Sequence, residues 1–336
     1  PRLTFLTPTL IAGDRSLVDV VAHELAHSWT GNLVTNASAE HFWLNEGWTV
    51  YAERRILEAL DGPEAAALHA ALGRKELDRT VEELRDKPEL TRLRMHMEGV
   101  HPDDAFSLVP YEKGYLFLRA LEDAVGRERF DGFLRGYIGH HRFQSLTSEA
   151  FVEYTRAHLP EALARVDASR WLDQPGVPEG APAPRSSRLD AIEAIGTALP
   201  PDGLSPIAWQ LYLERLPRPA PAGLCEALEA RFHLTASTNY EILVAWLELA
   251  AESDHAPAVP RIETVLGEVG RMKYLKPLYV ALAKKPATKA LAGRLFARYR
   301  DRYHPIAQQV IEGILRQHQV ATHEVNPVGL GKRTPL

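Results

Sequence analysis

Residues 20–56 read VVAHELAHSWTGNLVTNASAEHFWLNEGWTVYAERRI, and they contain the most informative spacing in the chain. His23 and His27 are four residues apart, and Glu24 directly follows the first histidine. On a helix this spacing puts both imidazoles on one face, where they can reach the same metal ion. Zinc accepts imidazole nitrogen, and a catalytic zinc site keeps three protein ligands and one open position. The stretch therefore predicts a helix that binds one Zn²⁺ ion, with Glu24 beside it as a general base.

Glu46 is the candidate for the third ligand. It follows His27 after 18 intervening residues, near the start of a second predicted helix at 45–60. Two antiparallel helices joined by a short connection would place Glu46 against the histidine pair. Each part of this pattern also has a purely structural interpretation. Glu46 could be an acid that the helix macrodipole favours near a helix N-terminus. His23 and His27 could lie on a solvated face of their helix.

The first helix is predicted to begin at Gly13-Asp14, with Asp14 or Ser16 as its N-cap. Its periodicity indicates an apolar face that packs against protein, which favours the metal site over a solvated face. That face consists of Leu17, Val20, Val21, Leu25 and Trp29.

Glu53 lies seven residues after Glu46, about two helical turns, and therefore shares its face. From there it can hydrogen-bond one of the ligand histidines. An ion pair with a nearby arginine at the surface is an equally good interpretation. His41 has no metal-ligand spacing and is interpreted as structural.

The rest of the chain indicates a mainly helical fold. Helices are predicted at 63–84, 112–125, 127–141, 147–158 and 160–172, with a long loop at 86–110 and a short strand at the start of the chain. A Pro- and Gly-rich linker at 174–189 separates a domain at 1–173 from amphipathic segments at 190–320. Pairs of these segments recur about every 35–40 residues, which favours a stacked helical repeat. Residues 321–336 are interpreted as a loose tail.

Composition excludes several classes of protein. The formal net charge of −5 comes without a concentrated basic block, which argues against a general nucleic-acid partner. No apolar run approaches the roughly 18 residues of a membrane span, so no membrane partner is expected. Cys225 is the only cysteine, so no intrachain disulfide can form. A cytoplasmic location is expected, and an upstream targeting segment stays open as an alternative.

Several stretches together resemble the M1 family of zinc aminopeptidases, and most closely its leukotriene A4 hydrolase and aminopeptidase B branch. They are the region already quoted, TFLTPTLIAGDRS at 4–16, SLVPYEKGYLFL at 107–118 and GRMKYLKPL at 270–278. The resemblance implies a thermolysin-like catalytic domain followed by an α-helical repeat domain of the armadillo or HEAT type. It also implies a zinc-dependent enzyme that removes N-terminal residues from short peptides.

The resemblance assigns further roles. Tyr111 matches the tyrosine that stabilises the oxyanion, and Arg271 and Lys273 match cations that hold the free carboxylate of a short peptide. Asp103 aligns with an acid that places water in the epoxide hydrolase members. Phe106 stands where those members carry a tyrosine, which makes epoxide hydrolysis the weaker alternative. A non-catalytic helical scaffold that binds peptides is a further alternative.

In this family a Gly-x-Met-Glu-Asn loop just upstream of the matched region holds the α-amino group of the substrate. The chain begins at Pro1, where that loop would end. We therefore expect a missing N-terminal domain of the same protein as an intramolecular partner. We also expect zinc binding but little aminopeptidase activity from this chain alone.

Overall fold

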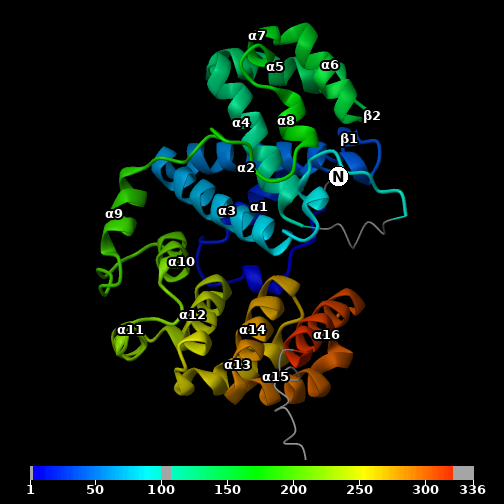
Figure 1. Cartoon of the computed structure of the whole chain (residues 1–336). Helices are drawn as coiled ribbons and strands as arrows, with labels where there is room; N and C mark the ends of the chain where they lie inside the picture. Colours follow the sequence, from blue (N-terminus) through cyan, green and yellow to red (C-terminus); the bar gives the residue numbers. More distant parts are fainter. Residues whose placement is uncertain (1–2, 100–106, 321–336) are drawn as a thin grey trace, which may run out of the picture. The chain divides into compact units, whose positions relative to one another are not determined.

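The computed structural model describes residues 3–99 and 107–320, and it is mostly helical, as predicted (Figure 1). The chain forms two compact units. The first comprises Pro1–Ile195 with Leu204–Leu211, and the second comprises Gly196–Gly203 with Tyr212–Leu336.

The first unit contains the predicted metal-binding stretch. Its helices are α1 (Val18–Ala26), α2 (Trp43–Asp61), α3 (Pro63–Glu83), α4 (Gly114–Val125), α5 (Arg127–His140), α6 (Ser148–His158), α7 (Pro160–Leu163), α8 (Ala168–Asp173) and α9 (Ser187–Ile195). Helix α10 (Pro206–Arg215) begins in this unit. Two short strands, β1 (Val34–Asn36) and β2 (Gln144–Leu146), pair in parallel, with Val34 opposite Gln144.

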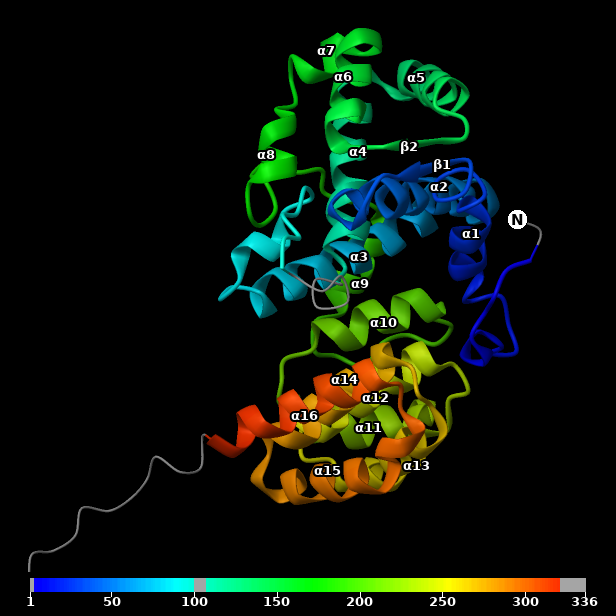
Figure 2. The ribbon, with the colours of Figure 1, turned by 90° about the vertical axis from the view of Figure 1, so that its right-hand side faces the viewer.

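Helix α2 is the central element of the first unit, because it contacts α1, α3 and α4 (Figure 2). Its buried aromatic side chains explain this position: Trp43 is fully buried, and Trp48 stacks on Phe130 of α5. The helix ends at Gly62, whose φ of +87° suits glycine, and Pro63 begins α3. The sequence Asp61-Gly62-Pro63 predicted this boundary correctly.

Helix α1 differs from the prediction in two ways. It begins at Val18 because the Asp14 side chain accepts a hydrogen bond from the backbone N–H of Ser16, which forms a turn before the helix. The small residues Ala22 and Ala26 are the buried ones in this helix. In contrast, Val21, Leu25 and Trp29, which were predicted to pack, are 43%, 55% and 47% exposed.

Two other local predictions were wrong. Residues 3–7 form no strand, and a 3₁₀ turn follows at Pro8–Leu10. The helix predicted at 160–172 is two helices, α7 and α8, which are separated by residues 164–167. The side chain of Asp167 caps α8 by accepting a hydrogen bond from the Ser169 N–H.

The segment predicted as a linker, 174–189, lies within the first unit. One carboxylate on α3 holds its end, because Glu64 accepts hydrogen bonds from the hydroxyls of Ser186 and Ser187 and from the N–H of Arg188. The two compact units divide further along the chain, after Ile195. The domain limits given by sequence composition stay a prediction.

The second unit is a layer of helices with a buried α12 (Tyr240–Glu252). Its other helices are α11 (Leu224–Phe232), α13 (Val259–Glu268), α14 (Met272–Lys284), α15 (Pro286–Tyr299) and α16 (Pro305–Val320). Helix α14 contacts α12, α15 and α16, which is the pattern of successive helices stacked on their neighbours. In neither unit does a described helix combine the length and apolar character that crossing a bilayer requires.

Candidate metal centre

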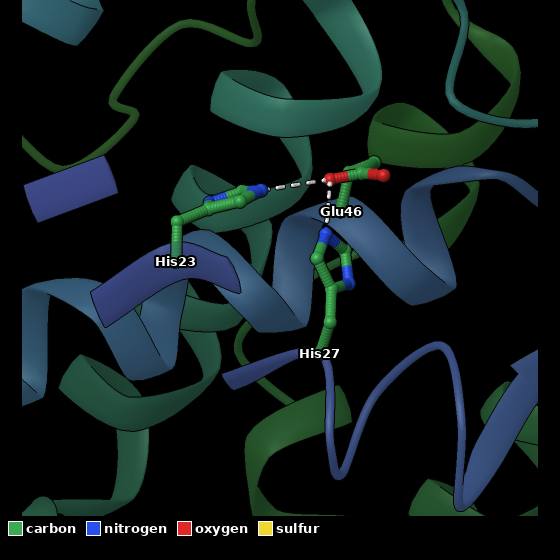
Figure 3. A group of neighbouring side chains, drawn as sticks. All are labelled: His23, His27 and Glu46. Atoms are coloured by element: carbon green, nitrogen blue, oxygen red, sulfur yellow. Dashed lines mark hydrogen bonds and ion pairs between the residues drawn. The ribbon is translucent and has the colours of Figure 1, made fainter. Parts of the chain in front are cut away.

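Three side chains from α1, its C-terminal end and α2 converge on one point (Figure 3). The Nε2 atom of His23 lies 3.2 Å from Oε2 of Glu46, and Nε2 of His27 lies 3.5 Å from the same oxygen. Glu46 is 6% exposed, and the two histidines are partly exposed. Two imidazoles and a carboxylate that follows His27 after 18 intervening residues thus face a common centre.

The other nitrogen of each imidazole is also occupied. Nδ1 of His23 lies 3.0 Å from Oε2 of Glu53, and Nδ1 of His27 lies 2.9 Å from the carbonyl oxygen of Thr30. Since a carbonyl or a carboxylate can only accept, each Nδ1 carries the proton. Each Nε2 is therefore the atom available as a metal ligand.

The charges around His23 favour a cation between the ring and Glu46. Burial alone would lower the pKa of His23, but hydrogen bonds to Glu46 and Glu53 outweigh it and raise the pKa from 6.5 to about 10. The proton would be shared between Nε2 of His23 and Oε2 of Glu46, which is also the position of a metal ion bound to both atoms. Since a histidine ligand must be neutral, metal and proton compete for this nitrogen.

The arrangement fits a zinc ion. Zinc–ligand bonds of about 2.0–2.2 Å in tetrahedral geometry place neighbouring ligand atoms about 3.3–3.6 Å apart. The two distances to Glu46 Oε2, 3.2 and 3.5 Å, are close to that range. All three ligand atoms lie within 4.8 Å of one another. Two imidazoles and one carboxylate are also the donor set that leaves a fourth position open in catalytic sites.

Two further predicted residues lie beside the centre. Glu24 is half-buried on α1, and the Tyr111 ring lies with its centroid 6.0 Å from that of His23. Burial raises the pKa of Tyr111 above its usual value of 10, and the negative charges of Glu46 and Glu24 raise it further. The phenol therefore stays protonated and can donate a hydrogen bond.

Tyr111 belongs to a π-helical turn, Val109–Lys113, that continues into α4. Two buried side chains of this turn anchor it. Glu112 accepts hydrogen bonds from Arg54 of α2 at 2.7 and 2.8 Å, and Lys113 donates to the carbonyls of Thr91 and Gln174. π-helical turns are rare and often occur at functional sites.

A glycine pair allows this turn to approach α2. A Cβ atom on Gly47 would lie 2.8 Å from the Cα of Gly114, and one on Gly114 would lie 2.9 Å from the Cα of Gly47. Neither position has room for a larger residue. The backbone of α2, next to Glu46, and the start of α4 are therefore in direct contact.

The remaining predicted residues belong to other elements. Arg271 is the N-cap residue of α14 in the second unit, and its side chain donates to the Tyr274 hydroxyl at 3.3 Å. Lys273 forms an ion pair at 2.8 Å with the buried Glu241. Asp103 and Phe106 lie outside the described residues. His41 is buried and bonds to Ser148.

The sequence prediction missed two residues of the site, Thr30 and Thr49. The Thr49 hydroxyl lies 3.2 Å from Nδ1 of His27. A signal existed, because Thr49 lies three residues after Glu46 and four before Glu53, on the same face of α2. A threonine in a helix has no strong functional association, so its spacing alone does not assign Thr49 to the site.

Two histidines and one glutamate are the donor set of a catalytic zinc site, and comparison with known proteins identifies the family. The sequence profile described as "Peptidase family M1 domain" matches residues 2–171. The chain belongs to peptidase family M1. A second profile, "Leukotriene A4 hydrolase, C-terminal", matches residues 204–315, which agrees with the branch that the sequence resembles.

Individual relatives agree with this assignment. The chain is 38% identical to "Leucine aminopeptidase 2" of Emericella nidulans, over 93% of this chain and 54% of that protein. It is also 38% identical to "Leucine aminopeptidase 2" of Neurospora crassa, over 93% of this chain and 50% of that protein. The chain thus spans about half the length of these curated relatives.

The fold matches solved structures over the same range. "Structure of yeast LTA4 hydrolase in complex with Bestatin" superposes with a TM-score of 0.84 at 32% identity, covering 94% of this chain and 56% of that one. "Structure of Native Leukotriene A4 Hydrolase from Saccharomyces cerevisiae" gives 0.79 at 33% identity, with the same coverage. The similarity therefore extends through both units of the chain.

Proposed function

We propose that this chain provides the catalytic centre of a zinc aminopeptidase that acts on short peptides. His23, His27 and Glu46 would hold one zinc ion per chain. The observation that carries the proposal is the convergence of two imidazole Nε2 atoms on one oxygen of Glu46. The relatives named leucine aminopeptidase 2 support the choice of reaction.

Each group around the centre has a separate role in amide hydrolysis. Zinc in such a ligand set polarises a carbonyl and lowers the pKa of a water molecule. Glu24 accepts the proton of the attacking water and delivers it to the leaving amine. Tyr111, kept protonated by burial and by Glu46 and Glu24, donates a hydrogen bond to the oxyanion.

Arg271 and Lys273 are the proposed binding groups for the free carboxylate of the peptide. They stand at the N-terminus of α14, where backbone N–H groups and the helix dipole also favour an anion. Arginine can bind a carboxylate through two parallel hydrogen bonds. The proposed role of Asp103, positioning water, rests on the family resemblance alone.

A second polypeptide segment is the proposed partner of the first unit. The matched region covers only 54% and 50% of the two curated relatives. The outer face of α1 carries Val21 and Leu25, with Trp29 just beyond, all exposed. Such a row of large apolar side chains on the helix that carries His23 fits a surface that another segment covers. We expect the N-terminal domain of the same protein to cover this apolar surface.

Metal analysis combined with one substitution tests the proposed function. We expect stoichiometric zinc in the purified chain. In the natural polypeptide that contains this sequence, Glu24→Gln should retain zinc and lower kcat on aminoacyl anilides by about 10²–10⁴-fold. Wild-type turnover in the Glu24→Gln protein would refute the assigned base. A chain purified without zinc would favour the alternative of a non-catalytic scaffold that binds peptides. Formation of a diol from a lipid epoxide would show that epoxide hydrolysis is a second activity.

A further inference from the structure

The Nδ1 atom of His27 is held by uncharged groups, whereas that of His23 is held by the carboxylate of Glu53. His27 is the C-cap residue of α1, one turn after His23, and the chain leaves the helix directly after it. Its ring is fixed from outside the helix. Nδ1 lies 2.9 Å from the Thr30 carbonyl and 3.2 Å from the Thr49 hydroxyl.

Thr30 and Thr49 form a closed hydrogen-bonded pair. Their hydroxyl oxygens lie 2.7 Å apart, and the Thr49 hydroxyl lies 3.1 Å from the Thr30 carbonyl. Thr49 is fully buried and Thr30 is 5% exposed, so water does not compete for these groups. One proton arrangement satisfies every group: the Thr30 hydroxyl donates to that of Thr49, and the Thr49 hydroxyl donates to the Thr30 carbonyl.

This arrangement determines which nitrogen of His27 carries the proton. The Thr30 carbonyl can accept two hydrogen bonds and donate none. It therefore accepts from Nδ1–H of His27 as well as from the Thr49 hydroxyl. The Nε2 lone pair of His27 is then directed to the centre that His23 and Glu46 share.

Gly31 makes the close approach of this loop possible. A Cβ atom at residue 31 would lie 3.0 Å from Nδ1 of His27, and the φ angle of +121° is one that other residues rarely adopt. The turn is closed by hydrogen bonds from Gly31 N–H to the Val34 carbonyl and from Asn32 N–H to the His27 carbonyl. The loop after α1 is thus folded tightly around the His27 ring.

We propose that Thr49 and Thr30 are positioning residues that fix the ring orientation and the tautomer of His27 for metal binding. The inference rests on the proposed zinc centre. His23 receives the equivalent support from the carboxylate of Glu53, whereas His27 receives it from uncharged groups. The Thr30 carbonyl and the Thr49 hydroxyl hold the His27 ring without adding negative charge near the centre, where Glu24, Glu46 and Glu53 already lie.

The test compares Thr49→Val with Thr49→Ser. Valine keeps the shape of threonine but removes the hydroxyl, whereas serine keeps the hydroxyl. We expect zinc affinity, measured by competition with a chromophoric chelator, to fall about tenfold or more in Thr49→Val, as for other supporting hydrogen bonds of metal ligands. Thr49→Ser should restore most of that loss. Circular dichroism verifies that both variants are folded.

A spectroscopic measurement separates positioning from simple packing. The Thr49 hydroxyl donates to the Thr30 carbonyl and so orients it toward Nδ1 of His27. Nitrogen-15 shifts of the His27 ring should therefore report the Nδ1–H tautomer in the wild-type chain and a larger share of the Nε2–H tautomer in Thr49→Val, where that orienting hydrogen bond is lost. Equal zinc affinity in wild type and Thr49→Val would overturn this inference alone, and so would equal losses in the valine and serine variants. Failure of the wild-type chain to bind zinc would overturn the metal centre and this inference with it.

Discussion

Oε2 of Glu53 lies 3.0 Å from Nδ1 of His23, on the ring edge opposite to the nitrogen that faces Glu46. Glu46 and Glu53 lie about two turns apart on α2, so a single helix supplies a carboxylate to each nitrogen of the same imidazole.

Replacing Glu53 with glutamine keeps a hydrogen-bond acceptor but removes the charge that makes the imidazole of His23 a stronger ligand. We expect Glu53→Gln to weaken zinc binding by about tenfold. Chelator competition measures this, with Glu82→Gln on the exposed face of α3 as the control.

Tyr111→Phe should lower turnover without removing zinc. The phenol is placed to donate to the oxyanion, and loss of one such donor costs about 10²–10³-fold in kcat. Because the pKa of Tyr111 is raised above 10, its ionisation should not limit activity at moderately alkaline pH. Steady-state kinetics of the natural polypeptide check both points, with Tyr240→Phe in the second unit as the control. A kcat within twofold of wild type would exclude the assigned role.

Gly114→Ala should destabilise the first unit. The added methyl group would overlap the backbone of Gly47, and overpacking of this kind costs about 1–3 kcal/mol. The matched control is Gly132→Ala in α5, where a Cβ atom meets nothing within 4 Å. That substitution should leave stability unchanged or raise it by up to about 1 kcal/mol, because alanine is the better helix former. Urea unfolding of both variants tests the contrast, and equal stabilities would refute the close contact.

His141 should make the first unit sensitive to acid. It is buried, and burial lowers its pKa below the ordinary 6.5, as do the neighbouring His140 and His158 when they are charged. Because the unfolded chain then binds the proton more readily, stability is full above pH 6.5 and is lost as the pH falls below it. His141→Asn should flatten this dependence. Free energies of unfolding between pH 8 and pH 5 measure it, and His96→Asn should keep the wild-type slope.

Arg271→Gln should discriminate between substrates by their C-terminus. Hydrogen bonds to a charged group contribute about 1.5–3 kcal/mol, so KM for a tripeptide with a free carboxylate should rise at least about tenfold. The corresponding tripeptide amide should show little change. Arg294→Gln, an exposed position on α15, is the control. Equal effects on the acid and the amide would contradict a carboxylate-binding role.

The main elements of the candidate centre could be predicted because they depend on short spacings. The four-residue step from His23 to His27 needs only helical geometry. The end of α2 could be predicted from Gly62 and Pro63, because each has a strong backbone preference. Residues on one face of one helix, such as Glu46 and Glu53, follow the same rule.

Features that depend on tertiary packing were not predicted. The contact between Gly47 and Gly114 joins residues 67 positions apart, and nothing local in either motif identifies its partner. The apolar row on α1 was predicted to be buried because Val21, Leu25 and Trp29 are large and apolar. Hydrophobic periodicity identifies a face that favours burial, but it does not tell whether the described chain contains the surface that covers it.

Helix α1 has nine residues, fewer than the roughly 12–15 that an isolated helix needs to be even marginally stable in water. A zinc ion shared by His23, His27 and Glu46 would bind only when this short helix is folded against α2. Occupancy of the centre and local unfolding of α1 would then be thermodynamically linked. At a free zinc concentration 100 times the Kd, the linkage would stabilise the folded segment by about 2.7 kcal/mol. Removal of zinc by a chelator would then raise the rate at which a protease cuts within Val18–Ala26.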